Sequence, residues 1–138
     1  MDVHTVAQRH ANMVAIKGKN TKPEMVVRRM LHRLGYRYRL HAKSLPGKPD
    51  LVFASRKKVI FVHGCFWHMH DCRFGQVVPQ TRTGFWQSKR QANAERDLRT
   101  ASQIAALGWS VCIVWECQLR EPHSAQLEVT RFLDHRLE

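Results

Sequence analysis

Hydrophobic positions recur along the chain at two spacings, and these spacings predict its helices and strands. A period near 3.6 residues predicts helices over residues 22–34, 86–107 and 123–137. The first helix follows a capping sequence, Thr21-Lys-Pro-Glu24, with a proline in its first turn. The second helix should bury one apolar side, formed by Ala94, Leu98, Ala101, Ile104 and Ala105.

Apolar runs and alternating residues predict four strands. Residues 36–40 alternate apolar with basic side chains, as in a half-buried strand. Residues 50–54 and 59–62 are short apolar runs with a connection that suits a hairpin, and the apolar run 109–115 should be the central strand. The order helix, three strands, helix, strand, helix predicts an α/β fold, with a mixed central sheet flanked by helices on both faces.

Length and charge narrow the class of protein. The chain has 138 residues, 43% of them hydrophobic, which is enough for the core of a single domain. It carries 23 Lys and Arg against 11 Asp and Glu, a formal net charge of +12. Since solubility is served equally well by acidic residues, this excess favours a nucleic-acid partner. We expect residues 1–20 to form a basic arm that contacts DNA, and residues 21–138 to form the folded domain.

The sequence also predicts the compartment and the state of the cysteines. No apolar run is long enough to cross a membrane, and the first fifteen residues contain no signal-peptide core. We therefore expect a cytoplasmic protein without a membrane partner, acting at the bacterial nucleoid. Cysteines in that reducing compartment more often bind metals or pack in the core than form disulfides. Cys112, inside an apolar run, is predicted to be a core residue.

The segment 62–72 carries the densest candidate chemistry, reading Val-His-Gly-Cys-Phe-Trp-His-Met-His-Asp-Cys. Two of its cysteines, with one later in the chain, can supply three thiolate ligands: Cys65, Cys72 and Cys117. A structural zinc needs a fourth ligand, which could be His68 or His70, and spacing alone does not decide between them. The histidine left out would be free to act as a general base. The alternative is a histidine-rich loop that binds no ion.

Two further features suggest chemistry on DNA. Asp50 begins one strand and His63 ends its expected hairpin partner, so antiparallel pairing can bring them side by side. A carboxylate there could hold magnesium for phosphodiester hydrolysis, or it could simply cap a turn. Phe66 and Trp67, held by a metal loop, could wedge between bases, or they could anchor the loop in the core.

Seven segments spread over nearly the whole chain together match one known family. They are Ser44–Asp50, Phe61–His68, Thr81–Thr83, Phe85–Trp86, Asn93, Glu95–Asp97 and Val114–Cys117. They resemble the Vsr endonucleases of very short patch repair. That family nicks DNA 5′ to the thymine of a T:G mismatch left by deamination of 5-methylcytosine, uses magnesium, carries a structural zinc and has a variant of the restriction-endonuclease fold.

The resemblance implies partners as well as an activity. The substrate would be double-stranded DNA with a T:G mismatch, and the enzyme would be functionally paired with a 5-methylcytosine methyltransferase. Mismatch-repair proteins are candidate partners. A single active site that cuts one strand implies a monomer.

The resemblance also implies catalytic roles for six residues. Asp50 would bind magnesium together with the main-chain carbonyl of Val62, because valine has no side-chain oxygen where many members have threonine. His68 would be the catalytic base. Three other residues would assist: His63, Glu24 and Asp97. His63 would contact the phosphate or act as an acid, and Glu24 would bind a metal-bound water or orient the site. The Asp97 carboxylate would orient the base, or it could instead pair with arginines of its own helix.

The zinc ligands and the DNA-binding residues follow from the same resemblance. Zinc would be bound by Cys65, His70, Cys72 and Cys117. The DNA-binding residues would be Met13, Phe66, Trp67, Trp86, Lys89 and Asn93. Met13 and the two aromatic residues of the loop would enter the duplex at the mismatch, where stacking is weak. Phosphate contacts are expected from Lys17, Lys19, Lys22, Lys89 and Arg90.

Two other functions are compatible with these residues. A sequence-specific, restriction-like nuclease of the same fold would cut correctly paired DNA as readily as mismatched DNA. A zinc-stabilised DNA-binding module without catalysis would nick no substrate.

Overall fold

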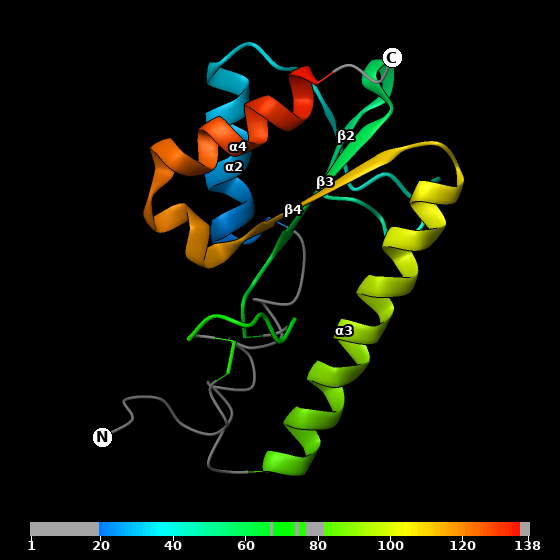
Figure 1. Cartoon of the computed structure of the whole chain (residues 1–138), viewed down its shortest axis with the longest axis vertical. Helices are drawn as coiled ribbons and strands as arrows, with labels where there is room; N and C mark the ends of the chain where they lie inside the picture. Colours follow the sequence, from blue (N-terminus) through cyan, green and yellow to red (C-terminus); the bar gives the residue numbers. More distant parts are fainter. Residues whose placement is uncertain (1–19, 67, 74, 77–81, 136–138) are drawn as a thin grey trace.

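The computed structural model describes residues 20–66, 68–73, 75–76 and 82–135 (Figure 1). In chain order its elements are α2 (Lys22–Arg33), β1 (Arg39–Leu40), β2 (Leu51–Phe53), the 3-10 helix η1 (Ala54–Arg56), β3 (Lys58–His63), α3 (Thr83–Ala106), β4 (Ser110–Trp115), the 3-10 helix η2 (Glu116–Arg120) and α4 (Pro122–Asp134). This confirms the expected order of helices and strands. Four residues with predicted DNA contacts lie outside the described residues: Met13, Lys17, Lys19 and Trp67.

The sheet is mixed, as expected, with the strand order β1-β2-β3-β4. β1 pairs with β2 and β2 with β3 in antiparallel fashion, whereas β3 and β4 are parallel, connected through α3. The prediction that residues 109–115 form the central strand is wrong, because β4 lies at the edge of the described sheet. Its apolar character reflects contacts with α3 and α4 rather than a strand on each side.

Helices cover both faces of the sheet. Figure 1 shows α2 and α4 together on one face and α3 on the other. The core under α2 and α4 is formed by Val27, Leu31, Leu51, Phe53, Ile60, Val114, Val129 and Leu133. The core under α3 is formed by Val52, Val59, Phe61 and Ile104. Successive residues of β2 and β3 therefore alternate between the two cores, as strand geometry requires.

The strand expected over residues 36–40 is shorter than predicted, since only Arg39–Leu40 pairs with β2. Tyr36 and Tyr38 still pack against the core, each meeting the ring of Phe53 edge-on at centroid distances of 6.5 and 5.8 Å. The alternating pattern thus identifies Tyr36 and Tyr38 as packed residues, but Leu40 is exposed, and the pattern overestimates the length of the backbone pairing.

The prediction for the buried side of α3 is also wrong in part. Leu98 is 74% exposed, and the buried residues of α3 are Arg90, Thr100 and Ile104. In Figure 1 the first half of α3 extends beyond the end of the sheet, so only its last turns can pack on β-strands. Ile104 of the predicted set is fully buried and Ala94 and Ala101 are partly buried, whereas Leu98 and Ala105 are exposed, because the inward face also carries polar residues that hydrophobic periodicity does not select.

Two expectations about the cysteines and the membrane can be compared with the structure. All four cysteines are free of disulfides, and Cys112 packs against the core below α2 and α4. Burial raises the pKa of Cys112 to about 11, as suits an inert core thiol. Among the described residues, no helix is both long and apolar enough to cross a membrane.

Candidate active site and metal centre

The end of β3 brings together Asp50 and the backbone of Val62. Asp50 directly precedes β2, and the pairing of Leu51 with Ile60 places its carboxylate beside the last residues of β3. The Val62 N–H donates a hydrogen bond to Asp50 Oδ2 at 2.7 Å. Because the N–H and C=O of one strand residue point to the same edge, the Val62 carbonyl is also directed to the side of Asp50, beyond the end of β2. These two groups could share one cation.

The electrostatics of Asp50 favour a cation nearby. Burial raises the pKa of Asp50 to about 6; the Val62 N–H opposes this rise and the nearby Glu24 carboxylate adds to it. The charged form of the carboxylate is therefore disfavoured by the protein alone. A divalent cation would reverse this balance, because it stabilises the ionised form directly.

A second carboxylate approaches Asp50 through a histidine that the sequence analysis missed. Glu24, in the first turn of α2, is only 2% exposed, and its two carboxylate oxygens lie 3.1 and 3.0 Å from His41 Nε2. The same His41 nitrogen lies 3.9 Å from Asp50 Oδ1. Arg28 Nη1 and the Asn20 N–H also donate to Glu24, at 3.3 and 3.2 Å. Ligand atoms of Glu24, His41 and Asp50 all lie within 4.8 Å of one another, close enough to hold a metal ion.

His41 was overlooked for a physical reason. In the sequence it follows a segment that alternates apolar with basic side chains, and this pattern predicts one more basic residue on the exposed side. In the structure its backbone N–H donates to the Asp50 carbonyl at 3.2 Å, just beyond the pairing of β1 with β2. The sheet register, which the sequence alone did not provide, places His41 at the site.

On the α3 side of the sheet end, His63 and His68 stack on each other beside Asp97. Their ring centroids are 3.8 Å apart and the rings are within 4° of parallel. The Asp97 Oδ2 atom accepts a hydrogen bond from His68 Nδ1 at 2.5 Å and lies 3.8 Å from His63 Nδ1. The contact of Asp97 with His68 agrees with the first of its two expected roles.

His63 differs from His68 in its surroundings. It is 5% exposed, and its Nδ1 is buried without a hydrogen-bond partner among the described residues. Burial lowers the pKa of His63 to about 4, an effect that the adjoining His68 reinforces and the Asp97 carboxylate opposes. Asp50 and His63 thus flank the end of β3 on different sides, Asp50 through the Val62 backbone and His63 against α3.

The cysteine cluster forms where the loop after β3 meets η2. Ligand atoms of Cys65, His70, Cys72 and Cys117 lie within 4.8 Å of one another. The distance from Cys117 Sγ to His70 Nδ1 is 3.6 Å. Bonds of about 2.3 Å to sulfur and about 2.0 Å to nitrogen at a tetrahedral angle separate two zinc ligands by roughly 3.6 Å. The cluster therefore has the size of a zinc site.

The chemistry of the cluster fits a zinc ion as well as its size does. Burial raises the pKa of the Cys65 thiol to about 12, and it also raises that of Cys117, so thiolates here require a positive charge beside them. His70 turns Nδ1 toward the thiols while its Nε2 lies 3.3 Å from Asp71 Oδ1, the outer partner that metal-binding histidines commonly have. Its ring also stacks on Trp115 at a centroid distance of 4.1 Å. Of the two alternatives from spacing, the structure brings His70 rather than His68 to the cysteines.

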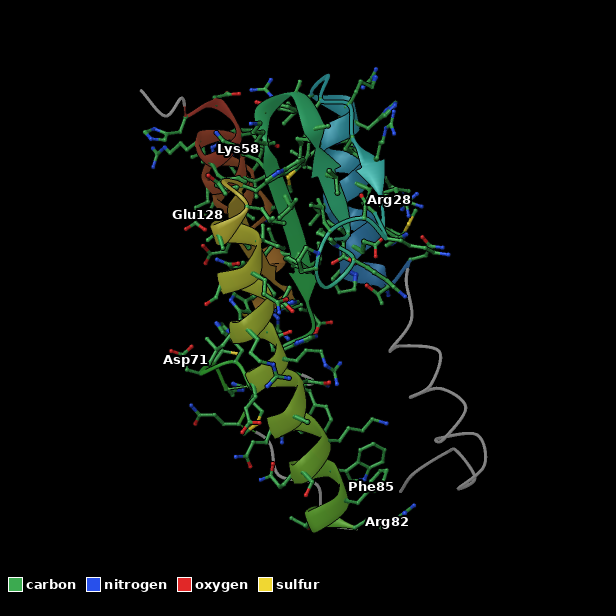
Figure 2. The ribbon with its side chains drawn as sticks, turned by 90° about the vertical axis from the view of Figure 1, so that its right-hand side faces the viewer. Arg28, Lys58, Asp71, Arg82, Phe85 and Glu128 are labelled. Carbon is green, nitrogen blue, oxygen red and sulfur yellow. The ribbon has the colours of Figure 1, made fainter. Side chains whose placement is uncertain are left out.

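Three of the predicted DNA-binding residues lie along one face of α3. Trp86, Lys89 and Asn93 follow each other at spacings of three and four residues, and Asp97 continues the same face toward the active site. Trp86 packs edge-on against Phe85, which is 46% exposed. Figure 2 shows Phe85 at the end of α3 that extends beyond the sheet. The helix thus carries the three residues outward from the site.

The expectation that Arg90 contacts DNA phosphate is wrong. Its side chain is only 1% exposed, and it bonds to the loop after β3, with Nε donating to the Phe66 carbonyl at 2.6 Å. Phe66 itself is half-buried, with the Arg90 guanidinium 4.3 Å from its ring centroid. A charge pattern on a helix could not reveal this, because it does not show which arginine meets a neighbouring loop.

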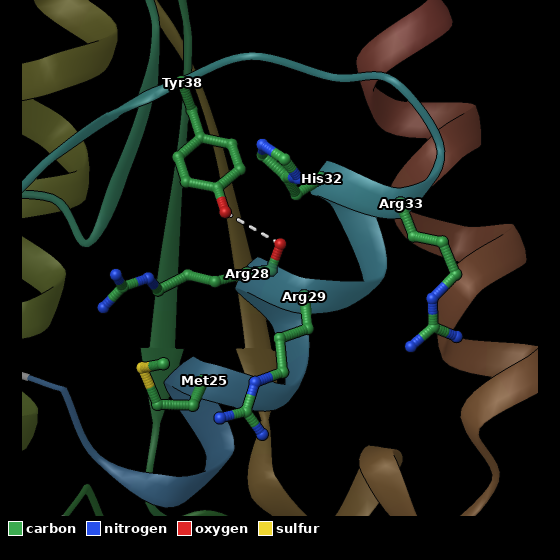
Figure 3. A pocket seen from close by; sticks show the side chains of 6 residues that line it. All are labelled: Met25, Arg28, Arg29, His32, Arg33 and Tyr38. Atoms are coloured by element: carbon green, nitrogen blue, oxygen red, sulfur yellow. Dashed lines mark hydrogen bonds between the residues drawn. The ribbon is translucent and has the colours of Figure 1, made fainter.

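A basic cleft of about 460 Å³ lies on the outer side of α2 (Figure 3). It is lined by Met25, Arg28, Arg29, His32, Arg33 and Tyr38. The Tyr38 hydroxyl donates to the Arg28 carbonyl at 2.7 Å, which fixes one wall. Within the described part of the chain, no ion pair is recorded for Arg29 or Arg33, so both charges are available to a phosphate.

Comparison with known proteins identifies the family to which the chain is similar. The model of the family described as DNA mismatch endonuclease Vsr matches residues 1–74. The DNA mismatch endonuclease Vsr of Escherichia coli is 48% identical over 119 residues, which cover 86% of this chain and 76% of that protein. The type II nicking enzyme V.XorIIP of Xanthomonas oryzae pv. oryzae is 49% identical over 122 residues, covering 88% of this chain and 89% of that enzyme. The type II nicking enzyme V.NmeAIP of Neisseria meningitidis is 42% identical over 119 residues, covering 86% and 84%.

The fold and the site define a nuclease with a restriction-endonuclease-like α/β domain, in which the end of a mixed sheet carries a carboxylate and a histidine pair. Relatives that match most of the chain are named as mismatch endonucleases and nicking enzymes. The chain belongs to the Vsr family of DNA mismatch endonucleases. It is a strand-nicking DNA endonuclease.

Proposed function

We propose that this endonuclease recognises a T:G mismatch left by deamination of 5-methylcytosine and nicks the DNA strand 5′ to the mismatched thymine. The observation that carries the proposal is that the end of β3 has an Asp97–His68 pair on its α3 side and Asp50 at the Val62 backbone, because the pair can supply a base and Asp50 a metal-binding carboxylate. A 5-methylcytosine methyltransferase would generate the sites at which the substrate arises. A single site of this kind cuts one strand, which suits a monomer.

For the chemistry, we assign His68 as the base. Its Nδ1 is held by Asp97, so Nε2 can accept a proton from the water that attacks the phosphorus. The Asp97 carboxylate then stabilises the imidazolium that forms. His63, stacked on His68, would contact the scissile phosphate, and Glu24, held by His41, would bind a water of the metal shell.

Two metals would support this chemistry. Asp50 and the Val62 carbonyl would hold magnesium, with water and phosphate oxygens completing the shell. Magnesium, when bound there, would neutralise the charge that develops on the phosphate. Cys65, His70, Cys72 and Cys117 would hold a structural zinc that braces the loop after β3.

Recognition of the mismatch would use that braced loop and the basic surfaces around it. Phe66, and Trp67 and Met13 outside the described residues, would enter the duplex beside T:G. Trp86, Lys89 and Asn93 on α3 would contact the same region, with residues 1–20 as a DNA-binding arm. The cleft on α2 supports a DNA-binding surface that continues to the active site, since Arg28 in its wall also bonds to Glu24. The phosphates that flank the cut would then lie along the cleft on α2.

A panel of duplexes tests the proposal. End-labelled duplexes that differ only in a central T:G, T:A or C:G pair, in several flanking sequences, would be incubated with the protein and magnesium. We expect one nick, 5′ to the thymine, in T:G duplexes alone. Equal nicking of paired duplexes would favour the restriction-like alternative. Intact DNA throughout would favour a non-catalytic module.

Substitutions measured in the same assay test the roles proposed for individual residues. Asp50→Asn and His68→Ala should abolish nicking while T:G binding and zinc content stay at the level of the unaltered protein. Cys117→Ala should lose zinc, whereas Cys112→Ala, which changes a core cysteine outside the cluster, should retain it. If nicking persisted in Asp50→Asn, the assignment of this carboxylate would be wrong.

A further inference from the structure

We propose that buried Arg90 is a positioning residue that fastens the loop after β3 to α3, and thereby presents Phe66 to the DNA in one orientation. The inference rests on the proposed function, in which Phe66 enters the duplex at a mismatch. It assigns the loop two attachments, the zinc cluster on the side of η2 and a guanidinium on the side of α3.

The contacts of Arg90 join two points of the loop that follows β3. Nε donates to the Phe66 carbonyl at 2.6 Å, and Nη2 donates to the Gly75 carbonyl. Nη1 donates to Gln87 Oε1 at 3.3 Å, one turn earlier on α3. Between Phe66 and Gly75 lie the catalytic His68 and two of the proposed zinc ligands. One side chain therefore holds both Phe66 and Gly75 close to α3.

The burial of Arg90 indicates that the arrangement is specific. The residue is 1% exposed, among the largest fully buried side chains of the described chain. Burying a guanidinium is costly unless its donors are satisfied, and its planar fork suits carbonyls held in fixed directions. An arginine placed only for solubility would extend its head into water. Gly75 is packed just as closely, since a Cβ there would lie 1.9 Å from the His70 carbonyl oxygen.

The guanidinium also constrains the ring of Phe66. Its central carbon lies 4.3 Å from the ring centroid, a cation–π distance, so one face of the ring is covered. A base can then meet only the rest of the ring. Unstacking a base step is costly, and a wedge that is already oriented avoids a further ordering cost on binding. Loss of Arg90 should therefore weaken mismatch binding more than binding to paired DNA.

The test uses the full-length, zinc-loaded protein and a duplex with 2-aminopurine next to T:G, whose fluorescence rises when the step is unstacked. We compare Arg90→Met and Arg90→Lys with Arg99→Met. Arg99 is exposed and lies nine residues further on α3, about 180° around the helix from Arg90, so it is a matched control. The readouts are the 2-aminopurine signal at saturation, the ratio of T:G to T:A binding constants, and zinc content.

We expect Arg90→Met to keep its zinc, to lose most of the fluorescence rise, and to reduce the T:G preference about tenfold, the effect of losing roughly one charge-assisted hydrogen bond. Arg90→Lys should fall between Arg90→Met and the unaltered protein, because lysine keeps the charge without the fork. Arg99→Met should match the unaltered protein.

The contradicting results are distinct. If Arg90→Met keeps the full signal and preference, the inference is wrong. If Arg90→Met does not fold, Arg90→Lys decides: an unchanged preference overturns the inference, and a reduced one with normal zinc supports it. If the unaltered protein gives neither a fluorescence rise nor T:G nicking, the proposed function fails first and the inference with it.

Discussion

At the residue scale, the histidines of the site are distinguished by the partner of each ring nitrogen. His68 commits Nδ1 to Asp97, whereas His70 turns Nδ1 to the Cys117 thiol and Nε2 to Asp71. A histidine held through Nδ1 by a carboxylate offers a basic Nε2, which suits proton transfer. A histidine whose Nε2 faces a carboxylate offers Nδ1, which suits a metal. The partners of the two rings therefore indicate different roles: His68 suits a base and His70, two residues later, suits a metal ligand.

The Asp97 carboxylate provides the first prediction at this scale. Asp97→Asn keeps the size of the side chain but no longer stabilises a protonated His68 or fixes its tautomer. The nicking rate should fall by about 100-fold or more at saturating DNA, the scale of general-base catalysis, with T:G binding unchanged. Single-turnover kinetics measure this, with Asp134→Asn, which changes an exposed carboxylate on α4, as a comparison. A rate within twofold of the unaltered protein would show that Asp97 does not act through His68.

His41 provides the second prediction at the residue scale. It bonds both oxygens of Glu24 and approaches Asp50, so His41→Ala should leave two buried carboxylates poorly oriented toward magnesium. The magnesium concentration for half-maximal nicking should rise about tenfold, as when an outer partner of a metal ligand is removed. Magnesium titrations of nicking measure it. The control is His123→Ala on α4, and an unchanged midpoint for His41→Ala would contradict the role.

At the scale of elements, the loop before β2 and α3 position the site together. Gly47 has φ +74°, and a Cβ built there would lie 2.4 Å from Thr100 Cγ2 on α3. The loop that delivers Asp50 therefore packs directly on the helix that delivers Asp97. Close approach, together with a left-handed backbone, explains a glycine at this position.

Gly47→Ala should accordingly destabilise the protein by about 2 kcal/mol or more, from left-handed strain plus the clash with Thr100. Urea unfolding of the zinc-loaded protein measures the change. Gly84→Ala is the matched control, because nothing lies within 4 Å of the added Cβ and alanine favours the helix. Equal stability of the two variants would show that the loop moves away from Thr100 without cost, which would contradict the prediction.

The elements also show what the sequence could and could not predict. Capping residues predicted α2 closely, since a helix start is a local signal. The buried side of α3 could be predicted only in part from hydrophobicity: Ile104 is buried as expected, but the inward face also carries Arg90 and Asp97 for the loop and the active site, while Leu98 is exposed. Three of the four residues of the cysteine cluster were predicted from their residue type, and only the choice of His70 as the fourth depended on the family resemblance. Spacing could not choose between His68 and His70, because their partners come from distant parts of the chain.

At the scale of the whole molecule, the formal net charge is +12, and basic residues lie on both α2 and α3. Arg28 lies on α2, across the sheet from α3, and Arg82 lies at the far end of α3 (Figure 2). Asp50 and His68 lie near the end of β3, which α2 and α3 cover from opposite faces of the sheet. A duplex held by its phosphates on both sides would place one strand over the sheet end.

The cleft on α2 gives a prediction for this scale. A double variant, Arg29→Gln with Arg33→Gln, should weaken T:G and paired DNA alike and reduce the slope of log K against log salt by about 1 to 2, because each phosphate contact releases a counterion. Fluorescence anisotropy over a range of salt measures the slope. Arg131→Gln, on α4, serves as the control. If the slope were unchanged in the double variant, the DNA phosphates would not contact the cleft on α2.

The central claim is that one site, built at the end of β3, cuts one strand at a mispaired thymine. The most direct measurement is to map the products of a single T:G duplex, labelled on either strand, after a single turnover with magnesium. We predict one product, cut 5′ to the mismatched thymine, with the guanine strand intact and the matching T:A duplex uncut. Cleavage of both strands, or equal cleavage of the T:A duplex, would contradict the account.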